Sequence, residues 1–263
     1  MRVEEAAAAL REAYRAGVPC APLRERLLPV GEVDAAYRVQ RRMVDGWLAD
    51  GRRRVGAKVG LTSVAVQRQL GVDEPDFGVL FADMAVPDGA EVPAGRLLQP
   101  KVEAEVAFVL GADLPHEQPT TVDVIRATDC VLPAIEIADC RIAGWDISIV
   151  DTVADNAAGG LFVLGTTPRR LGEVDLRTCG MVLEHGGSPV SVGAGAACLG
   201  NPLHAVAWLA GTLVAAGDLL RAGDIVLSGA LGPMVPVIAG AAYQARISGL
   251  GSVRVAFASE ESQ

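Results

Sequence analysis

The spacing of apolar residues in this 263-residue chain changes at Val55, and the change limits the folds open to the chain. Before that point, residues 4–17 and 33–50 carry helix-forming residues or apolar side chains at helical intervals, and each range ends at a glycine-containing turn. After it, short apolar runs alternate with Gly, Pro and Asp, as is typical of strands between turns. The pattern predicts an α+β protein with a helical N-terminal subdomain at residues 1–56 and a β-rich domain at residues 57–263.

The β-rich part contains several runs that fit strands and two that fit helices. In residues 252–258, Val253, Val255 and Phe257 alternate with other residues, so they are expected on one face of a last strand. A helix is expected at residues 201–216, because it begins with an asparagine cap and a proline in the first turn. The second helix is expected at 122–127, and the other strands at 79–81, 106–110, 161–164, 181–183 and 225–227.

Composition and charge exclude several classes of function. The net charge of −9 argues against a nucleic-acid partner, which would require a basic surface. Charges or prolines interrupt every apolar stretch before it reaches the ~20 residues of a membrane span, and the acidic N-terminus does not resemble a secretory signal. The five cysteines form no C-x-x-C pair, so we expect reduced, buried thiols in a cytoplasmic protein.

Two glutamates lie at the start of an apolar segment, where they indicate a metal site. Glu103 and Glu105 are two residues apart on an expected strand, so both carboxylates lie on the same face. Glu136 lies between two isoleucines, which is a costly place for an unpaired charge. A divalent cation held by these oxygens would remove the repulsion, and oxygen ligands favour Mg²⁺ or Mn²⁺. Alternatively, the three glutamates are strand-surface acids paired with Lys or Arg.

Two further residues are candidates for acid–base chemistry. Lys58 follows small residues and precedes Gly60 in an apolar segment, where desolvation readily shifts the pKa of an amine. Asp76 lies between Pro75 and Phe77, which would hold a carboxylate rigidly at the mouth of a pocket. Each also has a simpler interpretation, because Lys58 fits a surface lysine at a strand end and Asp76 fits a turn residue.

Several long motifs in a fixed order resemble one family. These motifs are residues 58–63, 71–78, 100–105, 134–137, 151–157, 198–202 and 221–233. Several motifs together are more specific than any single one. Through them the chain resembles, over nearly its whole length from Val33, the 2-hydroxypenta-2,4-dienoate hydratases (2-keto-4-pentenoate hydratases) of the fumarylacetoacetate hydrolase superfamily.

The resemblance implies a fold and a set of site residues. The fold would be a mixed β-roll core with flanking helices, preceded by a helical N-terminal part. The implied roles are Mg²⁺ or Mn²⁺ ligation by Glu103, Glu105 and Glu136, proton transfer by Lys58 and Asp76, and contact with substrate by Ser228 and Leu80.

The resemblance also implies an activity. The enzyme would add water to 2-hydroxypenta-2,4-dienoate, giving 4-hydroxy-2-oxopentanoate in the meta-cleavage catabolism of aromatic compounds. Two alternatives stay open, namely a 2-oxo-3-hexenedioate (4-oxalocrotonate) decarboxylase and a non-catalytic partner subunit of a decarboxylase–hydratase complex. By resemblance, the chain would form a homo-oligomer, a pentamer or a decamer, and would associate with other enzymes of its pathway. The chain departs from the family at Ala158, where many members have a serine close to the substrate.

Overall fold

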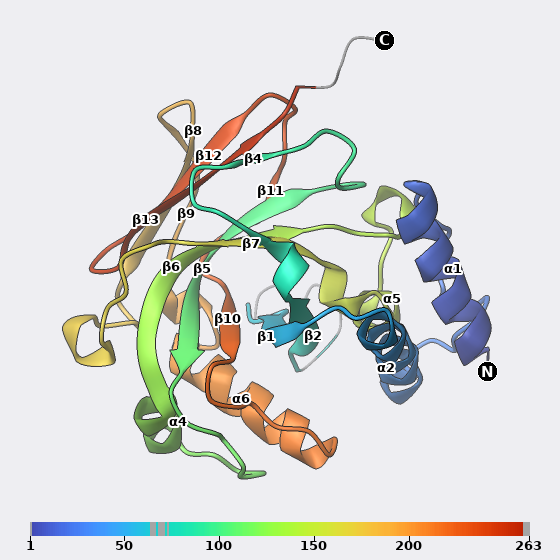
Figure 1. Cartoon of the computed structure of the whole chain (residues 1–263), viewed down its shortest axis with the longest axis horizontal. Helices are drawn as coiled ribbons and strands as arrows, with labels where there is room; N and C mark the ends of the chain where they lie inside the picture. The colour runs from blue at the N-terminus through green and yellow to red at the C-terminus, as the bar shows by residue number, and fades with distance from the viewer. Residues whose placement is uncertain (1, 64–66, 68–71, 73, 260–263) are drawn as a thin grey trace.

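Two β-sheets and five α-helices make up the computed structural model, which describes residues 2–63, 67, 72 and 74–259 (Figure 1). The larger sheet has the strand order β2-β1-β10-β5-β6-β7-β3, with β11 paired to β5. Its strands are β1 (Arg54–Gly60), β2 (Asp76–Phe81), β3 (Ala85–Val86), β5 (Lys101–Leu110), β6 (Thr128–Ala138), β7 (Gly159–Leu164), β10 (Ile225–Ala230) and β11 (Val235–Pro236).

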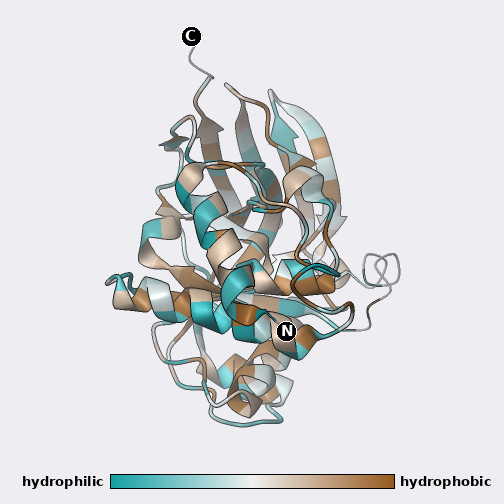
Figure 2. Cartoon of the chain, turned by 90° about the vertical axis from the view of Figure 1, so that its right-hand side faces the viewer, coloured by the Kyte–Doolittle hydropathy of each residue, from teal (hydrophilic) through white to brown (hydrophobic). Residues whose placement is uncertain are grey.

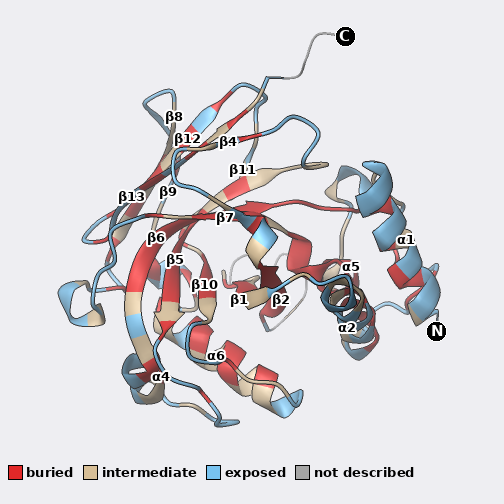
Figure 3. Ribbon diagram, in the orientation of Figure 1, coloured by how far each residue is buried: buried red, intermediate tan, exposed pale blue. Residues whose placement is uncertain are grey.

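The second sheet packs on the convex side of β5 and β6 and has the order β4-β13-β12-β8-β9. Val253, Val255 and Phe257 are buried on one face of its strand β13, which confirms the expected alternation. Buried residues of both sheets form the main core. Figure 3 colours the ribbon by burial and shows much of β5, β6 and β7 as buried. The strands of this sheet are β4 (Glu91–Val92), β8 (Gly180–His185), β9 (Ser188–Ala194), β12 (Ala242–Ile247) and β13 (Gly251–Phe257).

The N-terminal helices α1 (Val3–Ala16) and α2 (Val33–Ala49) confirm both helices predicted in this part. They bury their apolar faces in a second core that also takes in α5 (Ile149–Ala154), while their outer faces carry many hydrophilic residues (Figure 2). This second core therefore joins the first fifty residues to a segment a hundred residues further along the chain. The proposed domain division after residue 56 stays a prediction.

The remaining helices, α4 (Thr121–Ala127) and α6 (Pro202–Ala215), also match the expected positions. The apolar segment Gly195–Ala215 corrects the expectation that no stretch approaches membrane-spanning length, because among the described residues it alone is long and apolar enough. However, α6 itself has 14 residues, or roughly 21 Å, against ~30 Å of bilayer core. Its side chains Ala205, Leu209 and Leu213 are buried in the main core, as in the core helix of a globular domain.

Candidate metal and active site

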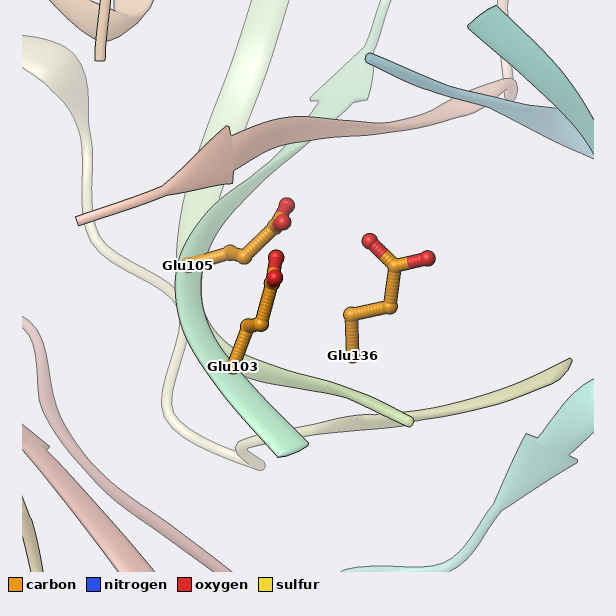
Figure 4. A group of neighbouring side chains, drawn as sticks. All are labelled: Glu103, Glu105 and Glu136. Atoms are coloured by element: carbon orange, nitrogen blue, oxygen red, sulfur yellow. The ribbon is translucent and has the colours of Figure 1, made fainter. Parts of the chain in front are cut away.

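Three glutamates converge on the face of the larger sheet that lies away from the second sheet. Glu103 and Glu105 project from the same face of β5, and Glu136 lies directly opposite Glu103 on β6 (Figure 4). One carboxylate oxygen from each lies within 4.8 Å of the others. The period of two along β5 and the register between β5 and β6 therefore produce the cluster that the sequence indicated.

The cluster lacks the partners that buried carboxylates normally have. Glu105 and Glu136 are almost completely buried. Among the described residues, Oε1 of Glu105 and Oε2 of Glu136 have no hydrogen-bond partner, and Oε1 of Glu136 has only the ammonium of Lys58. Burial and the charge of Glu136 raise the pKa of Glu103 to about 7, and the same two causes raise the pKa of Glu105 well above its usual value. Three such groups can ionise together only if a cation neutralises them.

Lys58 is buried beside the glutamates on β1. Its Nζ lies 2.7 Å from Oε1 of Glu136 and donates a hydrogen bond of 2.8 Å to the carbonyl oxygen of Ala157. Burial alone lowers the pKa of an amine, but the negative charges of Glu136, Asp76 and Glu103 outweigh it and raise the pKa of Lys58. The side chain is therefore a fixed, protonated ammonium and not the surface lysine of the simpler interpretation.

Asp76 begins β2 and is completely buried. It lies opposite Gly60 of β1, and a Cβ added to Gly60 would come within 2.1 Å of Oδ1 of Asp76, so only glycine leaves room for this carboxylate. Neither oxygen of Asp76 has a hydrogen-bond partner in the described part of the chain. Burial raises its pKa to about 6, although the ammonium of Lys58 opposes this change. Asp76 can therefore hold or release a proton near neutral pH.

A bulge in β10 brings a backbone N–H to the glutamates. The pairing of β10 with β5 shifts between Leu227 and Ala230, and in this bulge the N–H of Gly229 donates a 2.8 Å hydrogen bond to Oε2 of Glu105. Gly229 has φ +104°, and an added Cβ would lie 2.4 Å from the side chain of Thr62, so glycine is required. This donor is not among the site residues that the sequence pattern indicated.

The two expected substrate contacts are both buried. Ser228 lies in the same bulge, next to the residue that holds Glu105, and its carbonyl oxygen accepts a hydrogen bond from the thiol of Cys198. Leu80 lies on β2, on the strand face that also carries Asp76, and belongs to the main core. Their roles toward substrate stay predictions. Residues 71 and 73 of the motif at 71–78 lie outside the described residues.

The donor set fits a hard divalent cation. It offers carboxylate oxygens only, several of them without partners, on a rigid pair of strands, and this chemistry suits Mg²⁺ or Mn²⁺ better than zinc. The fixed ammonium of Lys58 and the titratable Asp76 lie beside it. Such an arrangement can bind a small anionic molecule, stabilise negative charge on its oxygen and exchange a proton with it.

Comparison with known proteins agrees with this chemistry. The pattern of the fumarylacetoacetate (FAA) hydrolase C-terminal family matches residues 51–258. The chain is 58% identical to 2-keto-4-pentenoate hydratase 2 of Dechloromonas aromatica (strain RCB), over 98% of each chain. It is also 57% identical to the TodF product hydratase of Pseudomonas putida F1, over 97% of this chain and 95% of that one.

Solved structures show the same fold. The 4-oxalocrotonate decarboxylase from Pseudomonas putida G7, complexed with magnesium and adipate, superposes with a TM-score of 0.91 at 37% identity over 98% of both chains. The fumarylpyruvate hydrolase from Pseudomonas aeruginosa, in complex with Mn²⁺ and pyruvate, superposes with a TM-score of 0.63 at 19% identity, over 79% of this chain and 90% of that one, a likeness of fold alone. The chain therefore belongs to the 2-keto-4-pentenoate hydratase family, within the fumarylacetoacetate hydrolase superfamily.

Proposed function

We propose that this chain is a divalent-metal-dependent hydratase that converts 2-hydroxypenta-2,4-dienoate into 4-hydroxy-2-oxopentanoate. The observation that carries the proposal is the buried cluster of three glutamates beside Lys58 and Asp76, in a chain 54–58% identical to several hydratases named for this reaction. A short anionic substrate suits a small site that carries one ammonium and one proton-transferring carboxylate.

The cation would be Mg²⁺ or Mn²⁺, and Glu103, Glu105 and Glu136 would hold it. The structures of the related decarboxylase are complexed with magnesium in one case and calcium in the other, which supports a hard divalent ion for this chain. When bound, the cation supplies Lewis acidity that stabilises negative charge on an oxygen of the substrate.

The residues of the chain provide the proton transfer. Asp76 in its protonated form delivers a proton to C5 of the dienol, and the proton of the 2-hydroxyl passes through water back to the Asp76 carboxylate. The product of this step is the 2-oxo-3-enoate. Water then adds its hydroxyl at C4 and a proton at C3, so the overall change is the gain of one water molecule. Lys58 stays protonated and balances the negative charge of the substrate.

The decarboxylase reaction is the second candidate, because the chain shares 37% identity and a TM-score of 0.91 with a 4-oxalocrotonate decarboxylase. The higher identity to hydratases supports the hydratase reaction. A non-catalytic subunit is the third candidate, but it would have no need for an unpaired carboxylate at Asp76 or for three crowded glutamates. We expect a cytoplasmic homo-oligomer in each case.

The test uses purified protein that has been treated with chelator and dialysed. Freshly generated 2-hydroxypenta-2,4-dienoate is supplied with and without Mg²⁺ or Mn²⁺, and the loss of dienol absorbance is followed while the product is identified. Metal-dependent formation of 4-hydroxy-2-oxopentanoate supports the proposal. Release of CO₂ from 2-oxo-3-hexenedioate without hydration of the dienoate would assign the chain to the decarboxylases instead.

A further inference from the structure

A left-handed turn follows α5 and faces the amine of Lys58. Asn156, Ala157 and Ala158 have φ values of 54°, 53° and 51°, a region that L-residues with a Cβ seldom occupy and almost never in succession. All three residues are buried. Three adjacent residues in this conformation persist only where the surrounding structure holds them, and such features gather at functional sites.

The side chain of Asn156 anchors the turn to β2. Its Oδ1 accepts a 2.8 Å hydrogen bond from the N–H of Val79, and its Nδ2 donates one of 3.0 Å to the carbonyl oxygen of Val79. Because β2 is the edge strand of the larger sheet, the amide satisfies two backbone groups that would otherwise be left open. A Cβ added to Gly78 would lie 2.3 Å from the carbonyl oxygen of Asn156, so the turn lies directly against the strand.

Arg141 holds the two ends of the same turn. Its guanidinium donates hydrogen bonds to the carbonyl oxygens of Asp155 and Gly159, at 2.6 Å and 2.9 Å, and pairs with the side chain of Asp155. The backbone is therefore held on both sides of residues 156–158. Their shape directs the carbonyl oxygen of Ala157 toward Nζ of Lys58, at 2.8 Å.

We propose that Asn156 is a positioning residue for the reaction, which acts by holding the Ala157 carbonyl as a fixed acceptor for the ammonium of Lys58. Lys58 has a long, flexible side chain, and its contact with Glu136 alone would not fix its direction. The Ala157 carbonyl is a second acceptor, and together with Glu136 it restricts the position of the ammonium. The expected effect of Asn156 on turnover rests on the proposed function. The effect of Asn156 on the position of Lys58 does not, since this position can be measured without substrate.

The test exploits the fact that the chain has two lysines, Lys58 and Lys101. Wild type and Asn156→Gly are acylated with an amine reagent, and the rate at each lysine is followed by peptide mass spectrometry, with Lys101 as the internal reference. Glycine adopts the left-handed conformation freely, so this variant removes the amide bridges without adding backbone strain. We expect acylation of Lys58 to rise about tenfold relative to Lys101, and kcat to fall about tenfold, with KM and Mn²⁺ affinity within about twofold.

Two further variants separate this role from general loss of stability. Gly78→Ala displaces the turn by placing a Cβ of β2 against the carbonyl of Asn156, and it should give the same increase at Lys58. Val253→Ala truncates the core of the second sheet and should leave the reactivity of Lys58 unchanged. Equal increases in Val253→Ala, or no increase in either turn variant, would overturn the inference. If the turn variants expose Lys58 while the wild type fails to hydrate the dienoate, the proposed function fails and the placement of Lys58 by Asn156 stands.

Discussion

Two groups of buried carboxylates in this molecule have opposite surroundings. Asp139, Asp151 and Asp155 receive hydrogen bonds on both oxygens, mostly from backbone N–H groups and from arginines. In contrast, Asp76 has no hydrogen-bond partner on either oxygen within the described ranges, and Glu105 has a partner on only one. The oxygens of the first group have their hydrogen bonds inside the protein, and those of the second group largely do not.

The number of hydrogen-bond partners separates carboxylates with a structural role from carboxylates that are available to bind a ligand. Asp151 receives the N–H groups of Leu23 and Arg24 on one oxygen, and the side chains of Arg24 and Ser148 on the other, and so joins the segment before α2 to α5. Within the described ranges, the three glutamates of β5 and β6 have direct contacts with one ammonium, that of Lys58, and one backbone donor, the N–H of Gly229. Native proteins rarely leave buried polar groups unpaired, so this deficit indicates a site for a cation.

The largest expected effect concerns the cluster itself. Glu103→Gln keeps the shape of the side chain but removes one charged ligand, and we expect turnover to fall about 1000-fold because the metal's charge stabilisation is lost. Mn²⁺ affinity, measured by titration of the metal-free protein, should weaken in parallel. The single substitution Asp139→Asn, at a buried carboxylate outside the cluster, is the control and should leave Mn²⁺ affinity unchanged. Full activity of Glu103→Gln after dialysis would disprove the metal assignment.

The second expected effect concerns proton transfer. Asp76→Asn removes the group that holds the proton while it retains nearly the same volume, so kcat should fall about 100-fold or more. Because Asp76 is not among the three glutamates, Mn²⁺ affinity should stay within a few-fold of wild type. Steady-state kinetics and metal titration on the same preparation check this, and a parallel loss of metal binding would instead make Asp76 part of the metal site.

The features of the fold and the site that could be predicted from the sequence depend on local periodicity. Because side chains alternate between the two faces of a strand, Glu103 and Glu105 were expected on one face of β5, and the buried residues of β13 were expected on one face of that strand. The helices with clear caps or apolar stripes were likewise found near their true positions.

The parts that could not be predicted depend on partners far apart in the chain. Alanine has no local preference for the left-handed conformation, so nothing in the sequence Asn156-Ala157-Ala158 predicts it. The conformation is held by Val79 on β2 and by Arg141 after β6, and both contacts depend on the tertiary fold. Other elements were missed for a related reason, since their patterns are weak or interrupted and tertiary contacts decide them. They are the strands β1, β6, β9 and β12, the short strands β3, β4 and β11, and the short helix α5.

The pKa of Asp151, a structural carboxylate, is shifted in the opposite direction to the pKa values of Glu103 and Glu105. Burial alone raises the pKa of Asp151, but hydrogen bonds from Arg24 and Ser148 outweigh it and hold the pKa below its usual value of 3.8. Asp151→Asn should therefore lower the free energy of unfolding by about 3 kcal/mol near neutral pH. The stabilisation is present above the pKa of the unfolded state and is lost as pH falls through the folded value. Urea unfolding at several pH values checks this, and a constant difference down to pH 2 would contradict it.

The smallest expected effect is the change in the free energy of unfolding when Glu105 of the glutamate cluster is replaced by glutamine. In metal-free protein, Glu105→Gln removes a buried charge that burial and Glu136 already disfavour, so the free energy of unfolding should rise by about 1 kcal/mol. The amide can still accept the hydrogen bond from Gly229 and can donate to a neighbouring carboxylate. Because the folded-state pKa of Glu105 is raised, wild type loses stability as pH rises toward that pKa, and the advantage of the variant should grow from pH 5 to pH 8.

Saturating Mn²⁺ should reverse the order of stability, since it stabilises the wild type more than the variant. A variant less stable than wild type without metal would mean that Glu105, like Asp151, is a structural acid.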